Sequence, residues 1–263
     1  MTAVASNEPL LRADLNGIST LTLNRPAQRN ALSIGLMEAM IAELDRIKAD
    51  PTIRVVVITG AGTCFCAGHD LKELRADPSR AHYEKTFELC SQMMQRIVAL
   101  PQPVIAAVHG IATAAGCQLV ATCDLAVAAE ESHFATPGVN IGLFCSTPMV
   151  ALSRAVPRKQ AMEMLLTGEP IDAQTALRLG LVNRLAPTPQ VMEEAVDLAV
   201  EIIAKSPLTL KIGKQAFYAQ AELGLAAAYD YASQVMTENM MALDAQEGID
   251  AFLEKRKPEW KGC

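Results

Sequence analysis

The stretch that decides the fold reads Gly110-Ile-Ala-Thr-Ala-Ala-Gly-Cys-Gln118. It follows residues 103–108, a short apolar run of the kind that forms a fully buried strand. A second stretch of the same design, Thr63-Cys-Phe-Cys-Ala-Gly-His-Asp-Leu71, follows the apolar run at residues 54–59. Small residues dominate both turns, and small residues let a backbone approach a ligand closely.

A helix should begin within the first of these stretches, near Ala115. The first N–H groups of a helix have no partner inside it, so they point outward. Two such N–H groups aimed at one carbonyl oxygen would form an oxyanion hole. The alternative is that small residues after a strand only permit tight packing, and the residues alone leave both interpretations open.

The patterns along the chain predict an α/β core followed by helices. Residues 17–23 alternate apolar and polar, Ser33 is a helix N-cap before residues 34–48, and residues 125–129 form another buried strand. Further helices are expected at about 79–99, 158–166, 172–179, 190–204, 207–222 and 225–254. We therefore predict a core over residues 1–200 and a helical C-terminal region over residues 201–263 that packs on the core or joins subunits.

The amino-acid composition argues against several classes of function. The chain has 263 residues, 51% of them hydrophobic, and a formal net charge of −6, which argues against nucleic-acid binding. No apolar run approaches the ~18 residues that span a membrane, and the segment Met1–Pro9 lacks the basic and apolar regions of a leader. Seven scattered cysteines, an odd number, suggest reduced thiols. We expect a soluble, cytoplasmic protein.

Two short segments only partly match the motifs they suggest. Gly60-Ala-Gly62 follows a strand, but the dinucleotide fingerprint needs a third glycine where this chain has Phe65. One cluster has the residue types of a metal site: Cys64, Cys66, His69 and Asp70. Its spacing matches no standard zinc pattern, and cysteine as a small apolar packing residue is the better account. No metal is predicted.

At these residues the chain resembles the crotonase (enoyl-CoA hydratase/isomerase) superfamily, whose signatures match in order along nearly the whole chain. The matching segments are Asn24-Arg-Pro-Ala-Gln-Arg-Asn-Ala-Leu32, Phe65-Cys-Ala-Gly-His-Asp-Leu71, Pro103-Val-Ile-Ala-Ala-Val-His-Gly110, Ala114-Ala-Gly-Cys-Gln-Leu119, Cys123-Asp-Leu125, Thr167-Gly-Glu-Pro-Ile-Asp-Ala173 and Leu179-Gly-Leu-Val182. The resemblance implies a spiral of ββα units, with C-terminal helices that build a trimer or, by pairing of trimers, a hexamer.

The resemblance also implies an acyl-CoA thioester as the ligand, with coenzyme A as part of the substrate and no other cofactor. The oxyanion donors would be the backbone N–H groups of His69 and Ala115, where Ala115 stands for the family's usual glycine. Backbone contacts to the adenine end would come from the loop Ala67, Gly68, His69, Asp70 and Leu71. Arg25 and Arg29 would lie near the CoA phosphates, a role that suits guanidinium geometry, unless they are only solvated loop charges.

The chain departs from the family at the residues that perform hydration. The family's hydratases have glutamates at the positions that match Gln118 and Gly138. A glutamine can orient water but cannot accept a proton, and a glycine has no functional group. Loss of one positioned acid–base group typically costs ~10²–10⁴ in rate. Other branches use an aspartate where this chain has Ser146, and serine is not a comparable base.

Some side chains near the expected site remain as candidates for the chemistry: His69, Asp70, Cys145 and Ser146, with Cys66 as a further possible nucleophile. Histidine has the best intrinsic pKa for acid–base work, although in a packed loop it commonly caps the backbone. No motif pairs either cysteine with a base, which favours packing. The sequence thus predicts an acyl-CoA-binding crotonase-family enzyme, conventionally an enoyl-CoA hydratase/isomerase, without efficient hydration. Isomerisation, thioester hydrolysis, decarboxylation, weak hydration and a non-catalytic binder or regulatory subunit stay open.

Overall fold

The computed structural model describes residues 8–263, so the expectation about a leader at residues 1–7 lies outside the described part. Its strands are β1 (Leu10–Leu15), β2 (Ile18–Leu23), β3 (Val55–Gly60), β4 (Val104–Val108), β5 (Ile111–Thr113), β6 (Leu125–Ala129), β7 (His133–Ala135), β8 (Ile171–Asp172) and β9 (Arg184–Ala186). Within residues 8–263 they form a six-stranded sheet of order β1-β2-β3-β4-β6-β9 and a three-stranded sheet of order β5-β7-β8.

Helices follow the strands for most of the chain. The α-helices are α1 (Ile34–Ala49), α2 (Leu71–Ala76), α3 (Arg80–Ala99), α4 (Ala115–Thr122), α5 (Pro148–Ala155), α6 (Arg158–Thr167), α7 (Ala173–Leu179), α8 (Val191–Ile203), α9 (Pro207–Ala221), α10 (Leu225–Met240) and α11 (Leu243–Glu254), and short 3₁₀ turns occupy Pro26–Gln28, Pro137–Ile141 and Thr188–Gln190. The α/β class predicted from the sequence is confirmed.

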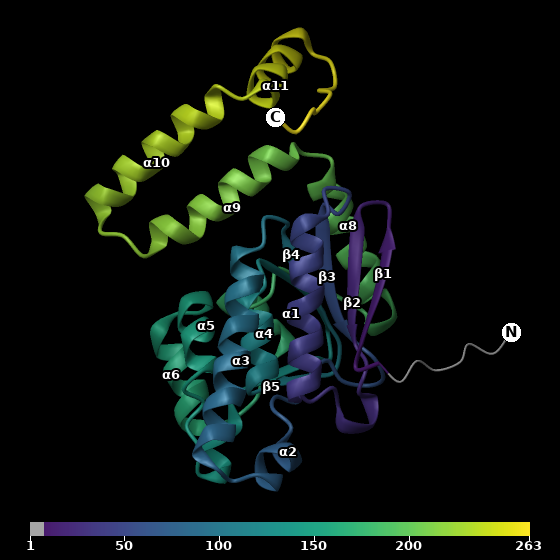
Figure 1. Ribbon diagram of the computed structural model, residues 1–263, viewed down its shortest axis with the longest axis vertical. Helices are drawn as coiled ribbons and strands as arrows, with labels where there is room; N and C mark the ends of the chain where they lie inside the picture. Colours follow the sequence, from purple (N-terminus) through teal and green to yellow (C-terminus); the bar gives the residue numbers. More distant parts are fainter. Residues whose placement is uncertain (1–7) are drawn as a thin grey trace, which may run out of the picture.

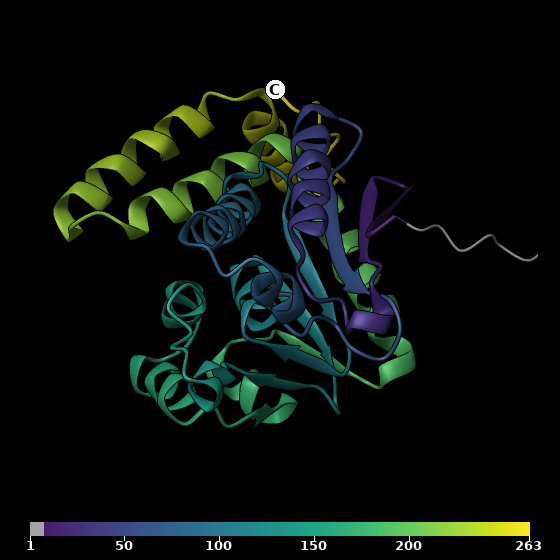
Figure 2. The same ribbon diagram turned by 60° about the horizontal axis from the view of Figure 1, so that its bottom comes forward.

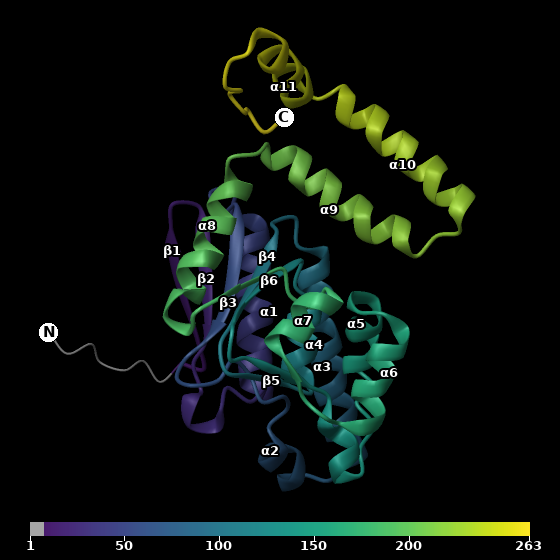
Figure 3. The same ribbon diagram turned by 180° about the vertical axis from the view of Figure 1, so that it is seen from behind.

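The large sheet lies between helices. Figure 1 shows α1 and α3 across its front, Figure 3 shows α8 across its back, and Figure 2 shows both layers from another side. Every residue of β3 and β4 is buried, because helices cover both faces of these parallel strands. Ser33 caps α1 as predicted, its hydroxyl accepting a hydrogen bond from the N–H of Leu36 at 3.2 Å.

The edge strand β1 was not predicted from the sequence. It pairs with β2 in an antiparallel hairpin joined by Asn16 and Gly17, whose φ angles are +51° and +81°. Asn-Gly with both residues at positive φ is the preferred two-residue hairpin turn, so the signal was present in the sequence.

The three C-terminal helices extend away from the layered core (Figures 1 and 3). The prediction of one helix over residues 225–254 was wrong, because the chain turns between α10 and α11. Asp244, only 1% exposed, accepts hydrogen bonds from the hydroxyl of Ser206 and the N–H of Lys261. These contacts hold α11 near the start of α9. The division between residues 200 and 201 stays a prediction.

Two strand ends place the candidate site. Neighbouring parallel strands β3 and β4 run in the same direction, so the segments that follow them, 61–70 and 109–114, emerge at the same edge of the sheet. An isolated parallel bridge joins Cys66 to Ala112, and a second joins Leu32 to His69. The two stretches singled out in the sequence therefore lie side by side. None of the helices in the described part of the chain is long and apolar enough to cross a membrane.

Candidate functional site

The loop after β3 is fixed by backbone hydrogen bonds on two sides. On one side, the N–H of Thr113 donates to the carbonyl of Cys66 at 3.0 Å. On the other side, the N–H of Leu32 donates to the carbonyl of Gly68 at 2.7 Å, and the N–H of Asp70 donates to the carbonyl of Leu32 at 3.1 Å. Gly68 has φ +91°, which an L-residue rarely adopts, so this turn needs a glycine.

These bonds set the direction of the His69 N–H. In a trans peptide the C=O and the next N–H point to opposite sides, and the described residues contain no cis peptide. Because the carbonyl of Gly68 points at Leu32, the N–H of His69 points away from Leu32. Among residues 8–263 it has no hydrogen-bond acceptor.

The same argument applies at the start of α4. The carbonyl of Ala114 accepts a hydrogen bond from the N–H of Gln118 at 3.0 Å, so it points along the helix. The N–H of Ala115 therefore points out of the helix N-terminus, and it too has no acceptor in the described part of the chain. A Cβ built on Gly68 would lie 3.3 Å from the Ala115 nitrogen, which shows how closely the two turns approach.

Both residues line one cavity of about 490 Å³. Most of its remaining wall is apolar and comes from α2, α3 and the segment 137–148. These wall residues include Leu71, Leu74, Phe87, Pro137, Ile141, Leu143, Phe144 and Pro148. Gly138, Cys145 and Ser146 also line this cavity, so the structure brings the predicted residues of three separate segments together. A concave, mainly apolar site with a few polar groups is typical of small-molecule binding.

Gln118 is buried behind the cavity and is not part of its lining. Its side-chain oxygen is 4.0 Å from the Sγ of Cys90, and within residues 8–263 no protein group binds its amide nitrogen. The pKa of the Cys90 thiol is raised to about 12 by burial, so this neighbour is neutral.

Gly138 lies where an added side chain would require its neighbours to shift. A Cβ built there would be 2.6 Å from the carbonyl oxygen of Leu143 and 2.9 Å from the Sγ of Cys145. The loop 139–145 thus occupies the space that a larger residue would need. The neighbouring Ser146 is exposed, and its hydroxyl donates to the carbonyl of Phe144 at 3.3 Å.

The His69 imidazole is neutral at neutral pH. Burial lowers its pKa to about 4, and the nearby Leu32 backbone opposes this shift only in part. Neither ring nitrogen has a hydrogen-bond partner of good geometry, while the ring stands edge-on to Phe87 with centroids 5.4 Å apart. This side chain therefore packs without an orienting partner, unlike the histidines of catalytic pairs.

The other candidate acid–base and nucleophilic groups are used structurally. Asp70 caps α2 through the N–H groups of Lys72 and Glu73, and it pairs with Arg25 at 2.8 Å. Burial acts to raise the pKa of Asp70, but these contacts outweigh it and lower the pKa. Burial raises the pKa of the Cys145 thiol, and raises that of Cys66 to about 12. Neither thiol is therefore a thiolate at neutral pH.

Comparison with known proteins supplies the family. The family model described as "Enoyl-CoA hydratase/isomerase" matches residues 14–263. The chain belongs to the enoyl-CoA hydratase/isomerase family. It is 48% identical over 245 residues to the mitochondrial enoyl-CoA hydratase domain-containing protein 3 of Rattus norvegicus, covering 93% of this chain and 82% of the relative. It is 39% identical over 243 residues to the 2,3-dehydroadipyl-CoA hydratase of Escherichia coli, covering 92% and 94%.

Solved structures agree with the family assignment. An enoyl-CoA hydratase of Mycobacterium smegmatis has a TM-score of 0.94 at 52% identity, covering 96% of this chain and 98% of that one. Human enoyl-CoA hydratase domain-containing protein 3 has a TM-score of 0.93 at 47% identity, covering 96% and 100%. The family resemblance inferred from the sequence is confirmed. Because the rat relative is described as mitochondrial, the cytoplasmic location stays a prediction.

Arg25 and Arg29, the two arginines predicted to lie near the CoA phosphates, differ from each other in their surroundings. Arg25 is held internally, by its ion pair with Asp70 and a hydrogen bond to the carbonyl of Ala31. Arg29 is exposed and has φ +50°, so its side chain extends from a tight turn. Within residues 8–263 no ion pair holds Arg29, in contrast to Arg25.

Sequence reasoning missed much of the apolar wall. Phe87 comes from the helix predicted at about 79–99, and the run Ile141-Gly-Leu-Phe144 was not assigned to a pocket wall. These three apolar residues stand next to Gly138 with no helical or strand period, and they are 41–60% exposed. The sequence signal that could have predicted this wall is an apolar run without helical or strand periodicity close to Gly138. Among residues 8–263, no group of three or more His, Cys, Asp or Glu side chains is arranged to hold a metal.

Proposed function

We propose that the cavity binds the acyl part of an acyl-CoA thioester, with the thioester oxygen accepting hydrogen bonds from the N–H groups of His69 and Ala115. Two observations support this assignment: both groups lack an acceptor, and both residues line the same cavity. Amides held rigid before the reaction stabilise a developing oxyanion without reorganising. The N-terminus of α4 carries the positive end of the helix dipole, which also stabilises negative charge near Ala115.

We propose further that efficient hydration is not the activity of this site. Hydration needs a group that activates water and a group that handles the α-proton, and among residues 8–263 those that line the cavity include no Asp or Glu. Gln118 cannot accept a proton, Gly138 carries no side chain, and the ring nitrogens of His69 are buried and have no partner among residues 8–263. The same oxyanion forms in a double-bond shift and in thioester cleavage; here water from the solvent would have to take the α-proton or act as the nucleophile, so we expect either reaction to be slow.

The decisive experiment offers the purified protein three thioesters: crotonyl-CoA, a 3-enoyl-CoA and a saturated acyl-CoA. Calorimetry measures binding, and separate assays follow hydration, double-bond shift and thiol release. We expect all three to bind and crotonyl-CoA hydration to be absent or at least ~10² slower than is usual for hydratases. Hydration at a usual hydratase rate would contradict the proposal about Gln118 and Gly138.

The oxyanion role has its own test, Ala115→Pro. Ala115 is the first residue of α4, a position where proline is tolerated, and the substitution replaces the backbone N–H with a ring carbon beside Ala114. We expect turnover of any accepted thioester to fall ~10²–10³-fold. Arg80→Pro, at the first position of α3 and outside the cavity, is the matched control. Equal activity of the two correctly folded variants would contradict the role of Ala115.

The second candidate function is a non-catalytic acyl-CoA binder or regulatory subunit. The observation that favours it is the absence of an ionised or oriented base among the described cavity residues. Tight binding of every thioester with turnover of none would select it. Loss of binding in Ala115→Pro would still be expected, because the amides hold the carbonyl in either case.

We also propose a homotrimer, or a hexamer made of two trimers, assembled through α9–α11, and a place for the CoA phosphates near Arg29. In support, Leu225 on α10, Phe252 on α11 and Met241 in the turn between them are 75–82% exposed, which is unusual for large apolar side chains. Light scattering gives the mass directly. Phe252→Asp should lower it toward the monomer, and an unchanged mass would contradict this interface.

A further inference from the structure

The chemical class of the acyl group is not fixed by the family. The 39% identical relative of Escherichia coli is described as a 2,3-dehydroadipyl-CoA hydratase, and an adipyl chain ends in a second carboxyl group. Other acyl chains end in a methyl group. The part of the ligand outside the acyl group is the same in all CoA thioesters, so a protein can distinguish them only through groups that contact the acyl chain.

The two amide donors determine which walls the acyl chain would contact. His69 and Ala115 line the cavity of about 490 Å³, so a thioester whose oxygen accepts their N–H groups has its first acyl carbon in this cavity. The chain that continues from this carbon lies against the remaining lining. Charge and polarity of that lining therefore decide which acyl groups bind.

The lining of this cavity carries no charged side chain in the described part of the chain. Two of its side chains can titrate, and both are neutral at neutral pH: burial lowers the pKa of the His69 imidazole to about 4 and raises the pKa of the Cys145 thiol. Its other polar side chains, those of Asn140, Ser146 and Thr147, are uncharged as well. A carboxylate in this cavity would have no cation to pair with.

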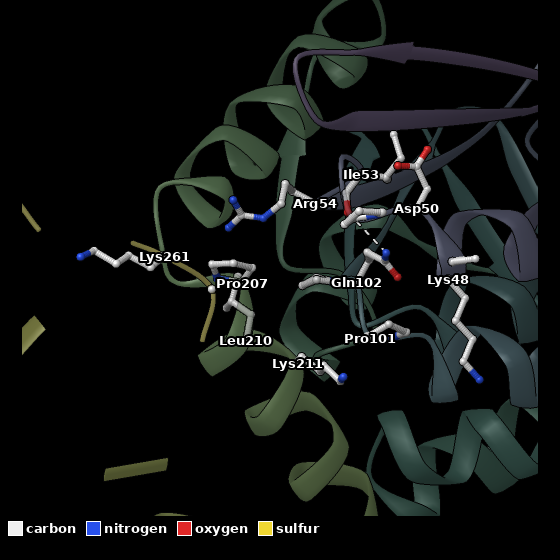
Figure 4. A pocket seen from close by; sticks show the side chains of 14 residues that line it. Lys48, Asp50, Ile53, Arg54, Pro101, Gln102, Pro207, Leu210, Lys211 and Lys261 are labelled. Carbon is white, nitrogen blue, oxygen red and sulfur yellow. Dashed lines mark hydrogen bonds between the residues drawn. The ribbon is translucent and has the colours of Figure 1, made fainter. Parts of the chain in front are cut away.

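A second cavity of similar volume, about 560 Å³, has a very different lining (Figure 4). It lies at the opposite end of the large sheet, because its residue Arg54 directly precedes β3. Its lining includes the charged side chains of Lys48, Asp50, Arg54, Lys211 and Lys261. The absence of charge is therefore a property of the acyl-CoA candidate cavity and not of every cavity in this chain.

Large apolar side chains of the acyl-CoA candidate cavity are in contact with solvent. Leu71 on α2 is 52% exposed, Phe87 on α3 is 38% exposed, and Ile141 and Leu143 on the loop are 60% and 55% exposed. All of them line this one cavity. An aliphatic chain that lies against them removes apolar surface from water, both its own and that of the wall, and this is favourable.

We propose that this cavity selects thioesters of uncharged, aliphatic acyl chains and rejects acyl chains that end in a carboxylate. The inference rests on the proposed function and names the substrate class of that same site. A methyl-terminated chain covers the exposed apolar wall. A terminal carboxylate loses part of its hydration there and gains no cation in return, which is unfavourable. Leu143, on the exposed loop, is a residue that determines this specificity.

A matched pair of ligands tests the selection: hexanoyl-CoA and adipyl-CoA, whose acyl groups have the same number of carbons and end in a methyl group and a carboxylate. Calorimetry with the full chain gives both dissociation constants. We expect hexanoyl-CoA to bind at least ~30-fold more tightly at neutral pH. In the series butanoyl-, hexanoyl- and octanoyl-CoA, each added methylene should tighten binding about two- to fourfold, because part of the wall stays in contact with solvent.

Substitutions of Leu143 separate charge from shape. Leu143→Lys provides a cation for the terminal carboxylate, so adipyl-CoA should bind about fivefold more tightly. Hexanoyl-CoA should change little, because the aliphatic stem of lysine still covers the wall. Leu143→Glu should weaken adipyl-CoA further. The matched control is Leu166→Lys, at a leucine of α6 that is 62% exposed and outside the cavity lining, and it should change neither affinity.

Three results would overturn the proposal: equal affinities for hexanoyl- and adipyl-CoA, an affinity that does not change with chain length, or equal effects of Leu143→Lys and Leu166→Lys on adipyl-CoA. The second result would assign the exposed loop to contact with another protein surface. The proposed function survives all three, because it requires only that CoA thioesters bind. If no thioester bound at all, the proposed function itself would fail, and this inference with it.

Discussion

Two walls of the acyl-CoA candidate cavity differ in what they are made of. The amide wall, residues 67–69 and 114–116, offers backbone N–H groups, and the loop wall, residues 137–147, offers side chains and the space between them. The amide wall holds the N–H groups of His69 and Ala115, which have no acceptor among residues 8–263. The loop wall has a glycine at position 138, and Leu143 and Cys145 occupy the space beside it. The backbone groups of the amide wall are fixed by the same hydrogen bonds that form the fold, whereas the loop wall depends on how its side chains pack.

Gly116→Ala tests the tightest contact of the amide wall and should have the largest effect. A Cβ at Gly116 would be 2.1 Å from the carbonyl oxygen of Cys66, which is itself bonded to Thr113. Neither backbone segment can move freely, so we expect a loss of more than about 3 kcal/mol in unfolding free energy. Urea unfolding measures it. Gly213→Ala, with nothing within 4 Å of the added methyl, is the control and should be neutral or stabilising.

The pH dependence of stability tests the side chain of His69 on the amide wall. Its pKa is lowered to about 4 in the folded state, against 6.5 for an unperturbed histidine. The unfolded chain therefore binds a proton first as pH falls, and stability present above pH 6.5 is lost as pH drops toward 4. At pH 4.5 this loss should be about 2 kcal/mol. His69→Gln, which cannot titrate, should show a smaller decrease between pH 7 and pH 4.5 in urea unfolding, and an identical decrease would contradict burial of the neutral ring.

Gly138→Ala probes the loop wall. The new methyl would contact the carbonyl of Leu143 and the Sγ of Cys145, but this loop is largely exposed and can shift. We expect a loss of about 1–2 kcal/mol, less than for Gly116→Ala. Adding Cys145→Ala removes one of the two contacts, so the double variant should recover part of the loss. A Gly138→Ala change as costly as Gly116→Ala would remove the distinction between the two walls.

The difference between locally fixed backbone and side-chain packing also explains which features could be predicted from the sequence. Buried strands and capped helices were predicted because local signals agree with burial, as at Ser33 and in β3. The start of α4 at Ala115 was also predicted. The break before α11 was missed because Asp244 is fixed by residues far along the chain, Ser206 and Lys261. The packing of Leu143 and Cys145 against Gly138 could not be predicted from the sequence. A sequence motif gives the residue at a position, but not which neighbours fill the space around it.

Ala114→Gly should have the smallest effect, and its sign is informative. Ala114 precedes α4 with φ +50° and ψ −119°, a conformation that costs a residue with a Cβ about 1–3 kcal/mol. It is held there by a hydrogen bond from its N–H to the carbonyl of Ala135 at 2.9 Å, and it directs the Ala115 N–H into the cavity. Glycine accepts this conformation without strain, so the variant should be stabilised by about 1 kcal/mol, less the backbone entropy that glycine adds to the unfolded chain.

Ala227→Gly is the control, at an exposed position within α10, and it should instead destabilise by about 0.5–1 kcal/mol. Opposite signs in the two urea titrations would establish that the amide wall stores strain, and two losses of equal size would show that Ala114 is relaxed.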